Sequence, residues 1–549
     1  MAKELLDAQT PLSADNVEAL VLYNSAASPC VRRVHITLIE KGLKYDTVEV
    51  DLPNMEQRSP SYLSLNPNGY VPTISHGEQV IFDSATINEY LDAQFLHTPL
   101  FPSSALERAQ VRMWIGSEEA MSKEFRPLLY QRVMGPIQHV SRSLKESQLI
   151  NRRCTSDPVD LAWGYQVWNM QVLTQQQEMQ QERKLMTWLD LVEEALENHD
   201  YLVANQFTQA DISVFPRVVM YSYLGLEIEP SRYPNVLLWI ERLEKRPSFE
   251  ASMSAQAKKL RKLATSPLLP KLRRILKKTE KKRSLMDKFF IWGLGRIMRK
   301  LQKVEVLLAA PAKPRDFPMP KKQLLPVKAT LNQKPVFLKT DSNIEIFGSS
   351  LSPHSQRIVT LLNFLGLAYS YHEIDLKNEK HKKSNFVALN PLAQVPVLKH
   401  GEHVIYDSRA IAEYLLENFD HQQLWWGTTS WQAAQNRMWL GMEAGTHKEF
   451  KPLWSKYILN SKDFSLDIKA EYSAINRIEQ KLKALEDTLE TNEFLCGDKI
   501  RFADIAWFTR IESMLLIPAF SIKKFPNLTR WYLRVKSTTE KVSQEIFGE

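Results

Sequence analysis

A long internal repeat constrains the fold of this 549-residue chain more than any other feature. Residues 65–95 recur 324 positions later, at residues 389–419, with 17 of 31 positions identical and no gap. Farther on, Ala210-Asp211-Ile212 recurs only 293 positions later as Ala503-Asp504-Ile505, so the first copy holds about 32 additional residues between Tyr130 and Thr187. One folding unit is therefore used twice, and a site in one copy must be sought in the other.

The composition predicts a globular protein of a reducing compartment. Hydrophobic residues make up 44% of the chain, but no apolar run approaches the ~18 residues of a membrane-spanning helix. The segment Met1–Asn16 lacks the hydrophobic stretch of a secretory signal. The three cysteines have no paired spacing, so we expect no disulfide framework and a cytoplasmic location. They are Cys30, Cys154 and Cys496.

Positive charge is concentrated in one segment between the two copies. The net charge of the chain is +8, yet residues 258–303 hold 17 Lys and Arg against only Glu280 and Asp287, so the rest of the chain is acidic. Five prolines follow this segment, and a stretch that contains so many cannot be helical throughout. They are Pro311, Pro314, Pro318, Pro320 and Pro326. We therefore expect a basic segment followed by an extended linker.

Apolar residues from Met286 to Leu308 recur at helical spacing, with Phe289, Phe290 and Trp292 near one end. A basic amphipathic helix of this kind can lie on an anionic membrane, which would give a peripheral membrane contact through residues 268–308. The same pattern also suits a helix that covers an apolar surface of the protein and leaves its lysines in solvent. Nucleic-acid binding is the weakest interpretation, because no recognition motif accompanies the charge, and we expect no nucleic-acid partner.

The first part of each copy alternates strand and helix patterns, and the remainder is helical from about residues 104 and 430 onward. In the first copy we expect strands at 19–23 and 45–50, helices at 31–40 and 84–95, and a hairpin between residues 71 and 82. In the second copy we expect strands at 344–347 and 369–374 and a helix at 355–365. The order in both is βαβ, then ββα, then an all-helical domain.

Three motifs recur at the ends of these elements. Ser28-Pro29 and Ser352-Pro353 each follow a strand and open a helix, where backbone N–H groups and the positive helix end favour an anion such as a thiolate. Asp83-Ser84 and Asp407-Ser408 open a second helix, where hydroxyl and N–H groups can hold a carboxylate. Each lies 11 residues after a Val-Pro pair. The pairs are Val71-Pro72 and Val395-Pro396.

In the order of these elements and motifs, the chain resembles two complete glutathione S-transferase units in tandem. The resemblance implies an α/β plus all-α fold, in which a thioredoxin-like domain precedes a helical domain in each unit. The implied thioredoxin-like domains span residues 17–97 and 342–421. The implied helical domains span residues 104–262 and 428–549, with residues 263–340 forming the basic segment and linker.

The resemblance also implies residue roles. Ser28 and Ser352 would activate glutathione as a thiolate, and Cys30, Ser25, Ser349 and Ser350 are alternatives. Both Val-Pro bonds would be cis and would offer the valine backbone, at Val71 and Val395, to the cysteinyl group of glutathione. The pairs Asp83-Ser84 and Asp407-Ser408 would hold its γ-glutamyl carboxylate. Gln394 matches the residue that contacts the glycyl end, whereas Tyr70 does not, which favours the second copy as the binder and leaves the first open to being inactive.

The electrophile would lie between the two domains of a unit, against aromatic residues of the helical half. The candidates are Trp114, Phe125, Tyr130, Trp439, Phe450, Trp454 and Tyr457. The histidines are scattered, so we expect no metal, and glutathione is the co-substrate implied.

Two functions stay open at this point. The first is a glutathione S-transferase that attacks a small hydrophobic electrophile. The second is a non-catalytic binding or regulatory protein of the same fold, associated with a membrane through the basic segment. Relatives commonly dimerise, so either the two units pair within one chain or the chain forms a homodimer.

Overall fold

Two four-stranded sheets with one topology form the centres of the two units. The computed structural model describes residues 19–25, 28–309, 315–317, 343–460 and 467–547. The strand order is β2-β1-β3-β4 in the first sheet and β6-β5-β7-β8 in the second, with only the first pair of each sheet parallel. The strands are β1 (Leu20–Asn24), β2 (Asp46–Glu49), β3 (Thr73–His76), β4 (Gln79–Phe82), β5 (Ile344–Gly348), β6 (Ser370–Glu373), β7 (Val397–His400) and β8 (His403–Tyr406). The predicted βαβ and ββα order is confirmed.

The helix that joins the parallel strands begins and ends where its sequence supplies the signals. In α1 (Pro29–Glu40) and α17 (Pro353–Phe364), a serine caps the first turn and a proline occupies the first helical position, where its missing N–H has no helical partner to lose. Gly42 and Gly366 follow these helices with positive φ of 61° and 65°, which glycine adopts without steric cost. These ends agree with the prediction to within about two residues.

The rest of each unit is helical, as predicted. The first unit (residues 19–254) contains α2 (Pro60–Leu63), α3 (Ser84–Gln94), α4 (Ala105–Leu129), α5 (Gly135–Ser141), α6 (Leu144–Cys154), α7 (Pro158–Trp168), α8 (Gln175–Ala195), α9 (Gln209–Val218), α10 (Tyr221–Leu224), α11 (Pro234–Glu244) and α12 (Pro247–Ala251). The second unit (residues 343–547) contains α18 (Ser384–Val387), α19 (Ser408–Phe419), α20 (Ser430–Ala444), α21 (His447–Tyr457), α22 (Ile468–Thr488), α23 (Phe502–Leu515) and α24 (Pro526–Phe547).

The additional residues of the first unit form α5, α6 and α7. These helices lie between α4 and α8, whereas the second unit passes directly from α21 to α22. The glutamine-rich stretch that ends at Gln181 belongs largely to α8, which has 21 residues, as does its counterpart α22. The insertion is therefore a helical addition to the first unit and leaves the repeated helices intact.

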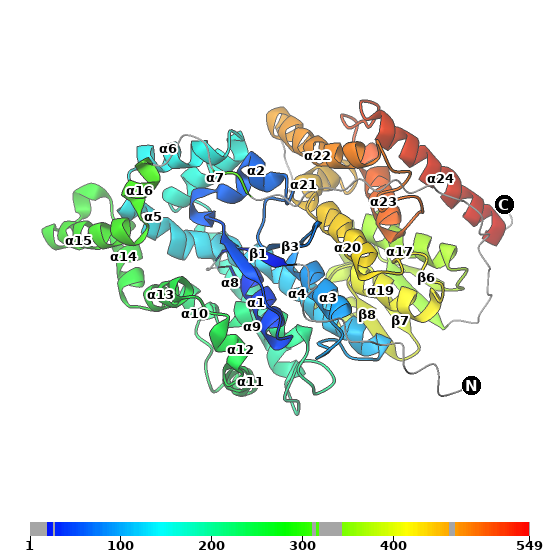
Figure 1. The fold of residues 1–549 in the computed structure, drawn as a ribbon, viewed down its shortest axis with the longest axis horizontal. Coiled ribbons are helices and arrows are strands. Elements are labelled where there is room, and N and C mark those ends of the chain that lie inside the picture. The colour runs from blue at the N-terminus through cyan, green and yellow to red at the C-terminus, as the bar shows by residue number, and fades with distance from the viewer. Residues whose placement is uncertain (1–18, 26–27, 310–314, 318–342, 461–466, 548–549) are drawn as a thin grey trace.

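The two units pack through reciprocal pairs of helices: α4 lies on α19, and α20 lies on α3 (Figure 1). Four charged residues are buried where these pairs meet. Arg112 and Arg437, which are repeat partners, each contact both Glu89 and Glu413, which are also repeat partners, at 2.7–3.0 Å. A cavity of about 30 Å³ lies among them, which is room for about one water molecule. The contact between units is thus a pseudo-twofold arrangement of like elements.

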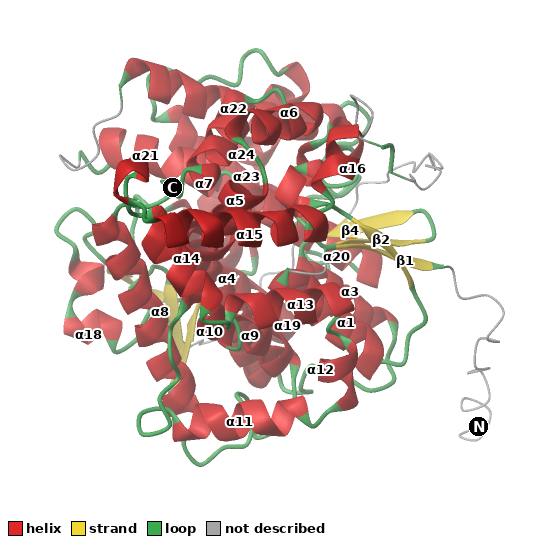
Figure 2. Cartoon of the chain, turned by 90° about the vertical axis from the view of Figure 1, so that its left-hand side faces the viewer, coloured by secondary structure: helices red, strands yellow, loops and turns green. Residues whose placement is uncertain are grey.

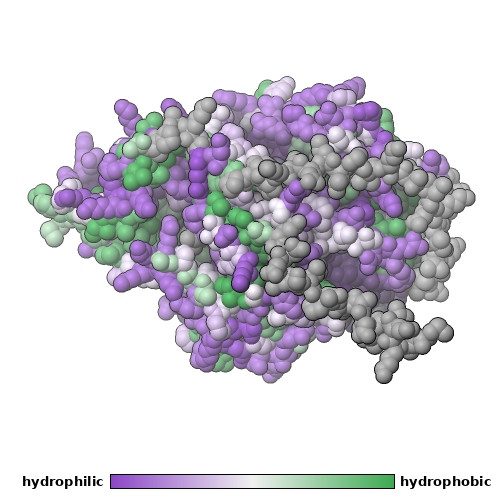
Figure 3. Space-filling view, in the orientation of Figure 1, coloured by the Kyte–Doolittle hydropathy of each residue, from purple (hydrophilic) through white to green (hydrophobic). Residues whose placement is uncertain are grey.

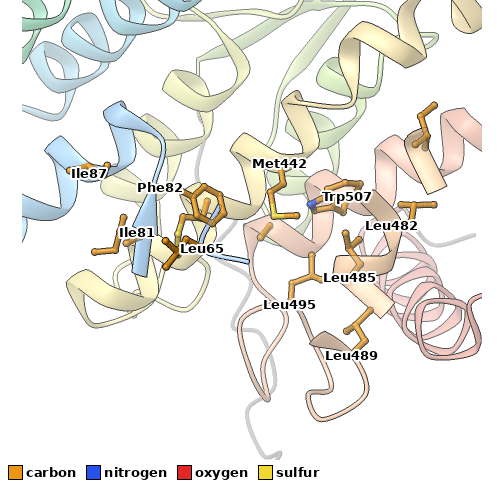
Figure 4. Close-up of a cluster of buried hydrophobic side chains, with 14 of the residues drawn as sticks. Leu65, Ile81, Phe82, Ile87, Met442, Leu482, Leu485, Leu489, Leu495 and Trp507 are labelled. Carbon is orange, nitrogen blue, oxygen red and sulfur yellow. The ribbon is translucent and has the colours of Figure 1, made fainter. Parts of the chain in front are cut away.

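One hydrophobic core crosses the boundary between the units. Phe82 and Leu65 of the first thioredoxin-like domain belong to the same buried cluster as Met442 and Trp507 of the second helical domain (Figure 4). Trp507 is completely buried, and Met442 is 5% exposed. Separating the units would therefore expose side chains of both cores, at a cost of roughly 25 cal/mol per Å² of apolar surface.

The basic segment folds as helices that pack on the first unit, largely on its inserted helices. It comprises α13 (Ala255–Ala264), α14 (Leu268–Leu276), α15 (Leu285–Leu301) and α16 (Val304–Ala309). In Figure 2, α14 and α15 cross in front of α5, and α15 packs on it. Among the described residues, no helix combines the length and apolar character needed to cross a membrane.

The single helical stripe predicted from Met286 to Leu308 is wrong in two respects. The helix breaks at Lys303, whose φ is +50°, before α16 begins. The residues that α15 buries are Leu294 and Met298, whereas Met286 is 77% exposed. Sequence periodicity cannot tell which apolar stripe a neighbour covers, because that depends on the surface of α5.

A short piece of the linker lies on the first sheet. Phe317 is 4% exposed, with its ring centroid 5.2 Å from that of Tyr62, and Arg315 forms an ion pair with Glu56. The five prolines of the predicted linker lie outside the described residues, as does the segment Met1–Asn16.

Candidate functional site

The loop before each first helix presents a serine whose hydroxyl caps the helix. Ser28 Oγ accepts a hydrogen bond from the Val31 N–H at 3.3 Å, and Ser352 Oγ accepts one from the Ser355 N–H at the same distance. The hydroxyl hydrogen of each serine is therefore left to donate. Ser28 is half-buried, but Ser352 is only 4% exposed, so Ser28 is the more accessible of the two serines.

The alternative hydroxyls of the second loop are engaged elsewhere. Ser349 Oγ donates to Glu373 at 3.0 Å, and the Ser350 hydroxyl also contacts that carboxylate. Ser25, the counterpart of Ser349, is 4% exposed, and its carbonyl accepts from the Ser28 N–H. These contacts hold the turn in place and leave Ser28 and Ser352 as the serines at the helix ends.

Both Val-Pro bonds are cis, as the resemblance implied, and each lies immediately before the third strand of its sheet. Val71 and Pro72 are buried, whereas Val395 is half-buried. Gln394, next to the second pair, is exposed, and its backbone carbonyl accepts from the Asn390 side chain at 2.7 Å.

Tyr70 occupies the place of Gln394 in the first unit and lies between two arginines. The guanidinium carbons of Arg58 and Arg126 lie 5.2 and 5.3 Å from the centre of its ring. The sequence showed that the first unit has no glutamine at this position, but it did not predict the two arginines beside the tyrosine. Arg126 comes from α4, and only folding brings it beside the strand. The first unit therefore places two guanidinium groups against an aromatic ring, whereas the second has Gln394 in place of the ring and Lys382 and Lys451 at the positions of the arginines.

Asp83 and Asp407 cap the helices α3 and α19. Their φ angles are 74° and 72°, and their side chains accept from backbone N–H groups of the first turn. Each aspartate also faces a glycine of the other unit: an added Cβ on Gly116 would lie 3.0 Å from Asp407 Oδ2, and one on Gly441 would lie 3.8 Å from Asp83 Cβ. Each helix start is therefore adjacent to the boundary between units.

The serines that follow these aspartates receive a hydrogen bond from a side chain. In the first unit, Arg33 Nε donates to Ser84 Oγ at 2.7 Å. In the second, His354 Nδ1 lies 3.3 Å from Ser408 Oγ, and Arg510 Nη2 lies 3.0 Å from His354 Nε2. A guanidinium can only donate, so Nε2 accepts and Nδ1 carries the hydrogen that is given to Ser408. Each serine is thus left with its own hydrogen to donate.

A buried carboxylate between two arginines supports each site. Glu118 contacts Arg33 at 3.0 Å and Arg217 at 2.6 Å. In the second unit, Glu443 contacts Arg357 at 2.8 Å and also pairs with Arg510. Sequence analysis did not identify these networks. The repeat carried the signal, since the three positions correspond at offsets of 324, 325 and 293 residues.

Burial and ion pairing shift the pKa values of the charged groups in these networks in opposite directions. Burial disfavours the charge of Arg33, but the Glu118 carboxylate outweighs it and raises the pKa of Arg33. Burial alone would raise the pKa of Glu443, but Arg357 and Arg510 lower it. Burial, together with the cationic Arg357 and Arg510, lowers the pKa of His354 well below its usual value, so this imidazole is neutral. The second site therefore combines fixed positive charge with a neutral histidine.

The position after the proline is the largest chemical difference between the two loops. Cys30 lies 3.8 Å from Arg33 Nη2 in the first unit, and His354 replaces it in the second. Among the described residues, the cysteines form no disulfide. No group of three His, Cys, Asp or Glu side chains in the described part of the chain could hold a metal ion.

The predicted electrophile residues divide into buried and partly buried groups. Phe125 and Phe450 are fully enclosed beneath the guanidinium groups of Arg217 and Arg510, each at 4.8 Å, and so support the charged networks. The half-buried aromatics are Trp114, Tyr130, Trp439, Trp454 and Tyr457.

Trp454 is the candidate aromatic that contacts the loop before α17. Its indole N–H donates to the Leu351 carbonyl, next to Ser352, at 3.1 Å. Tyr457 instead bonds to Glu471, and Trp439 to the Leu495 carbonyl. The first unit has Leu129 at the position of Trp454, so this indole contact has no counterpart at that position.

Comparisons with known proteins place the two units in a family. The family "Glutathione S-transferase, N-terminal domain" matches residues 27–94 and 351–418, and "Glutathione S-transferase, C-terminal domain" matches residues 166–247 and 464–538, together just over half of the chain. Glutathione S-transferase 3 of Zea mays is 29% identical over 240 residues, covering 43% of this chain and 94% of the maize protein. Glutathione S-transferase 1 of Dianthus caryophyllus is 41% identical over 98 residues, covering 18% and 44%. The solved structure of the beta-etherase LigF from Sphingobium sp. strain SYK-6 has 24% identity and a TM-score of 0.39, covering 43% of this chain and 98% of that one.

Proposed function

We propose that this chain, which belongs to the glutathione S-transferase family as two units in tandem, binds glutathione in both units and activates its thiol. One observation carries the proposal. In each unit a capping serine, a cis Val-Pro bond and a second serine with a hydrogen left to donate stand at the starts of two helices and one strand of the thioredoxin-like domain. The two units reach this arrangement with different supporting side chains.

The γ-glutamyl carboxylate of glutathione would bind at the start of α3 or α19. Ser84 and Ser408 each donate a hydrogen there, because Arg33 and His354 already occupy the acceptor side of their oxygens. The Arg–Glu–Arg networks add positive charge beneath the carboxylate. The valine backbone beside each cis bond pairs with the cysteinyl group in a strand-like manner.

The thiol of glutathione would lie at the start of α1 or α17. There the hydroxyl of Ser28 or Ser352 donates to the sulphur, and the positive helix end favours the thiolate. The thiol proton passes to solvent, the sulphur forms a bond to an electrophilic carbon, and the leaving group departs with the electron pair of the broken bond. The electrophile is a small hydrophobic molecule, held in the second unit beside Trp454.

The proposed binding is tested by calorimetric titration of glutathione into the full-length protein and into Ser84→Ala, Ser408→Ala and the double variant. Each substitution removes a hydrogen bond to a charged group, so we expect affinity in the affected unit to fall about 10- to 100-fold. The exposed Ser222→Ala is the matched control. Wild-type affinity in the double variant would overturn the proposal.

Activity is tested separately with glutathione and an activated aryl chloride. Ser28→Ala and Ser352→Ala should keep glutathione binding but lose thiol transfer in their own unit. Glutathione binding without transfer by the wild-type protein, across a panel of electrophiles, would instead support the non-catalytic alternative. A cytoplasmic location suits either function, because a reducing compartment maintains free thiols.

We also propose that the two units replace the two subunits of a dimer. The reciprocal α4–α19 and α20–α3 contacts and the shared core already bury the surface that a partner chain would cover. A solution mass of 63.6 kDa is expected, and a stable species of about 127 kDa, twice that mass, would contradict the proposal.

A further inference from the structure

The start of α15 exposes a group of large apolar side chains. Leu285, Met286, Phe289 and Trp292 are 75%, 77%, 65% and 60% exposed. They lie at i, i+1, i+4 and i+7, so they share one side of the helix. Single exposed apolar residues are ordinary, but four within eight residues mark a contact surface. We call these four residues the apolar tip.

The core of the protein does not use this side of α15. The opposite side packs on α5 through Leu294, Gly295 and Met298, and a Cβ on Gly295 would lie 2.6 Å from the Val140 carbonyl oxygen. This close approach fixes the rotation of α15 about its axis. The apolar tip therefore faces solvent because of specific packing.

Unpaired cations surround the apolar tip. Lys281, Lys282, Lys288, Arg296 and Lys300 are all exposed, and within the described part of the chain none forms an ion pair. The guanidinium of Arg296 lies 5.0 Å from the centre of the Trp292 ring. Aromatic and aliphatic side chains in the middle of a cationic ring suit a surface whose interior is apolar and whose outer layer is anionic.

The position of the apolar tip in the molecule agrees with such a contact. The helix α15 forms one end of the protein, and the second unit forms the other (Figure 1). At that end, Figure 3 shows hydrophobic residues protruding beside strongly hydrophilic ones. A flat surface could therefore touch α15 without approaching the loops of Ser28 and Ser352.

We propose that the apolar tip and its ring of cations dock the protein on an anionic lipid bilayer. Phe289, Trp292, Leu285 and Met286 enter the headgroup region, while the lysines and arginines stay at the level of the lipid phosphates. The protein is then a peripheral membrane protein held by one helix that lies in the interface. This inference is independent of glutathione binding.

The proposal is tested by co-sedimentation of the full-length protein with phosphatidylcholine vesicles, with and without phosphatidylserine. We expect the protein to sediment with the anionic vesicles only, and less so as salt rises. The double variant Phe289→Ser/Trp292→Ser should lower the vesicle partition coefficient by at least about tenfold. The matched control Leu516→Ser/Leu533→Ser, at exposed leucines of the second unit, should bind as the wild type does.

A second variant keeps the test decisive if the first folds poorly. Lys281→Glu/Lys282→Glu should abolish vesicle binding, whereas Lys377→Glu/Lys383→Glu, at exposed lysines of the second unit, should not. Equal binding to neutral and anionic vesicles, or equal loss in tip and control variants, would overturn the proposal. A third result would also overturn it. If the apolar substitutions leave vesicle binding unchanged and the charge reversal abolishes binding to both vesicles and nucleic acid, the surface is a general polyanion site.

Discussion

The loops before α1 and α17 share one backbone design but differ in the side chains that hold it. In the first unit Arg33 bonds directly to Ser84, and the position after the proline is Cys30. In the second unit His354 occupies that position and bonds to Ser408, while Arg357 contacts only the carboxylate of Glu443. The hydrogen bond to the serine is kept, but its donor has changed. What the site needs is a donor at that point in space, and no single residue type is required.

The comparison also extends to the surroundings of each loop. Beside the first loop, Arg58 and Arg126 lie against Tyr70, whereas Trp454 bonds to the second loop and Gln394 replaces the tyrosine. Both units have cations at the two arginine positions, since Lys382 and Lys451 correspond to Arg58 and Arg126. The units therefore differ in the aromatic side chains beside the loops more than in the sign of the charge there.

The largest effect is expected where the units meet. Arg112→Met leaves Glu89 and Glu413 to share one arginine, and breaking a buried ion pair costs about 3–5 kcal/mol. Arg437→Met should cost less, because Arg112 pairs with three carboxylates and Arg437 with two. Urea unfolding measures both free energies. Arg232→Met, at an exposed ion pair, is the control, and equal losses in all three variants would show that the two units are not mutually stabilised by this cluster.

A smaller effect should distinguish the two serine donors. Arg33→Met removes the hydrogen bond to Ser84, so the affinity of the first unit for glutathione should fall about 10- to 100-fold. This affinity is measured in a protein that also carries Ser408→Ala, which disables the second unit. Arg357→Met is measured in a protein that also carries Ser84→Ala. It should lower the affinity of the second unit for glutathione by a smaller factor, because His354 still donates its hydrogen bond to Ser408. Calorimetric titration compares the two. A greater loss in the second unit would reverse the assignment of donors.

The smallest effect concerns the pH dependence of stability. Burial and the neighbouring arginines lower the pKa of folded His354, so below the ordinary histidine pKa the unfolded chain binds a proton that the folded one does not. Stability should therefore fall as pH drops through the ordinary histidine range, between about pH 7 and pH 5, and His354 contributes to that fall. In His354→Cys, which carries the residue of the first unit, this part of the slope should disappear. An unchanged slope would mean that His354 is protonated in the fold.

Much of the local structure followed from sequence patterns. The helix predicted at 84–95 is α3 (Ser84–Gln94), and the strand predicted at 344–347 is β5 (Ile344–Gly348). Serine caps, prolines at first helical positions and the alternation of apolar residues are local signals, and they act over a few residues. The repeat then extended each assignment to a second copy. The motif serines were found for the same reason, since they lie at the ends of such elements.

The sequence by itself determined that one unit is used twice, in what order its elements come, and where the repeated Ser-Pro, Val-Pro and Asp-Ser motifs stand. Only the tertiary structure decided which side of α15 is exposed, that Glu118 and Glu443 each join two arginines, and that Arg112 and Arg437 meet across the units. Helices and strands are specified by short-range hydrogen bonds and by the spacing of apolar residues, and both can be read from a local stretch of sequence. Contacts between residues 67 to 348 positions apart depend on how complete surfaces fit, and a linear pattern does not contain that fit.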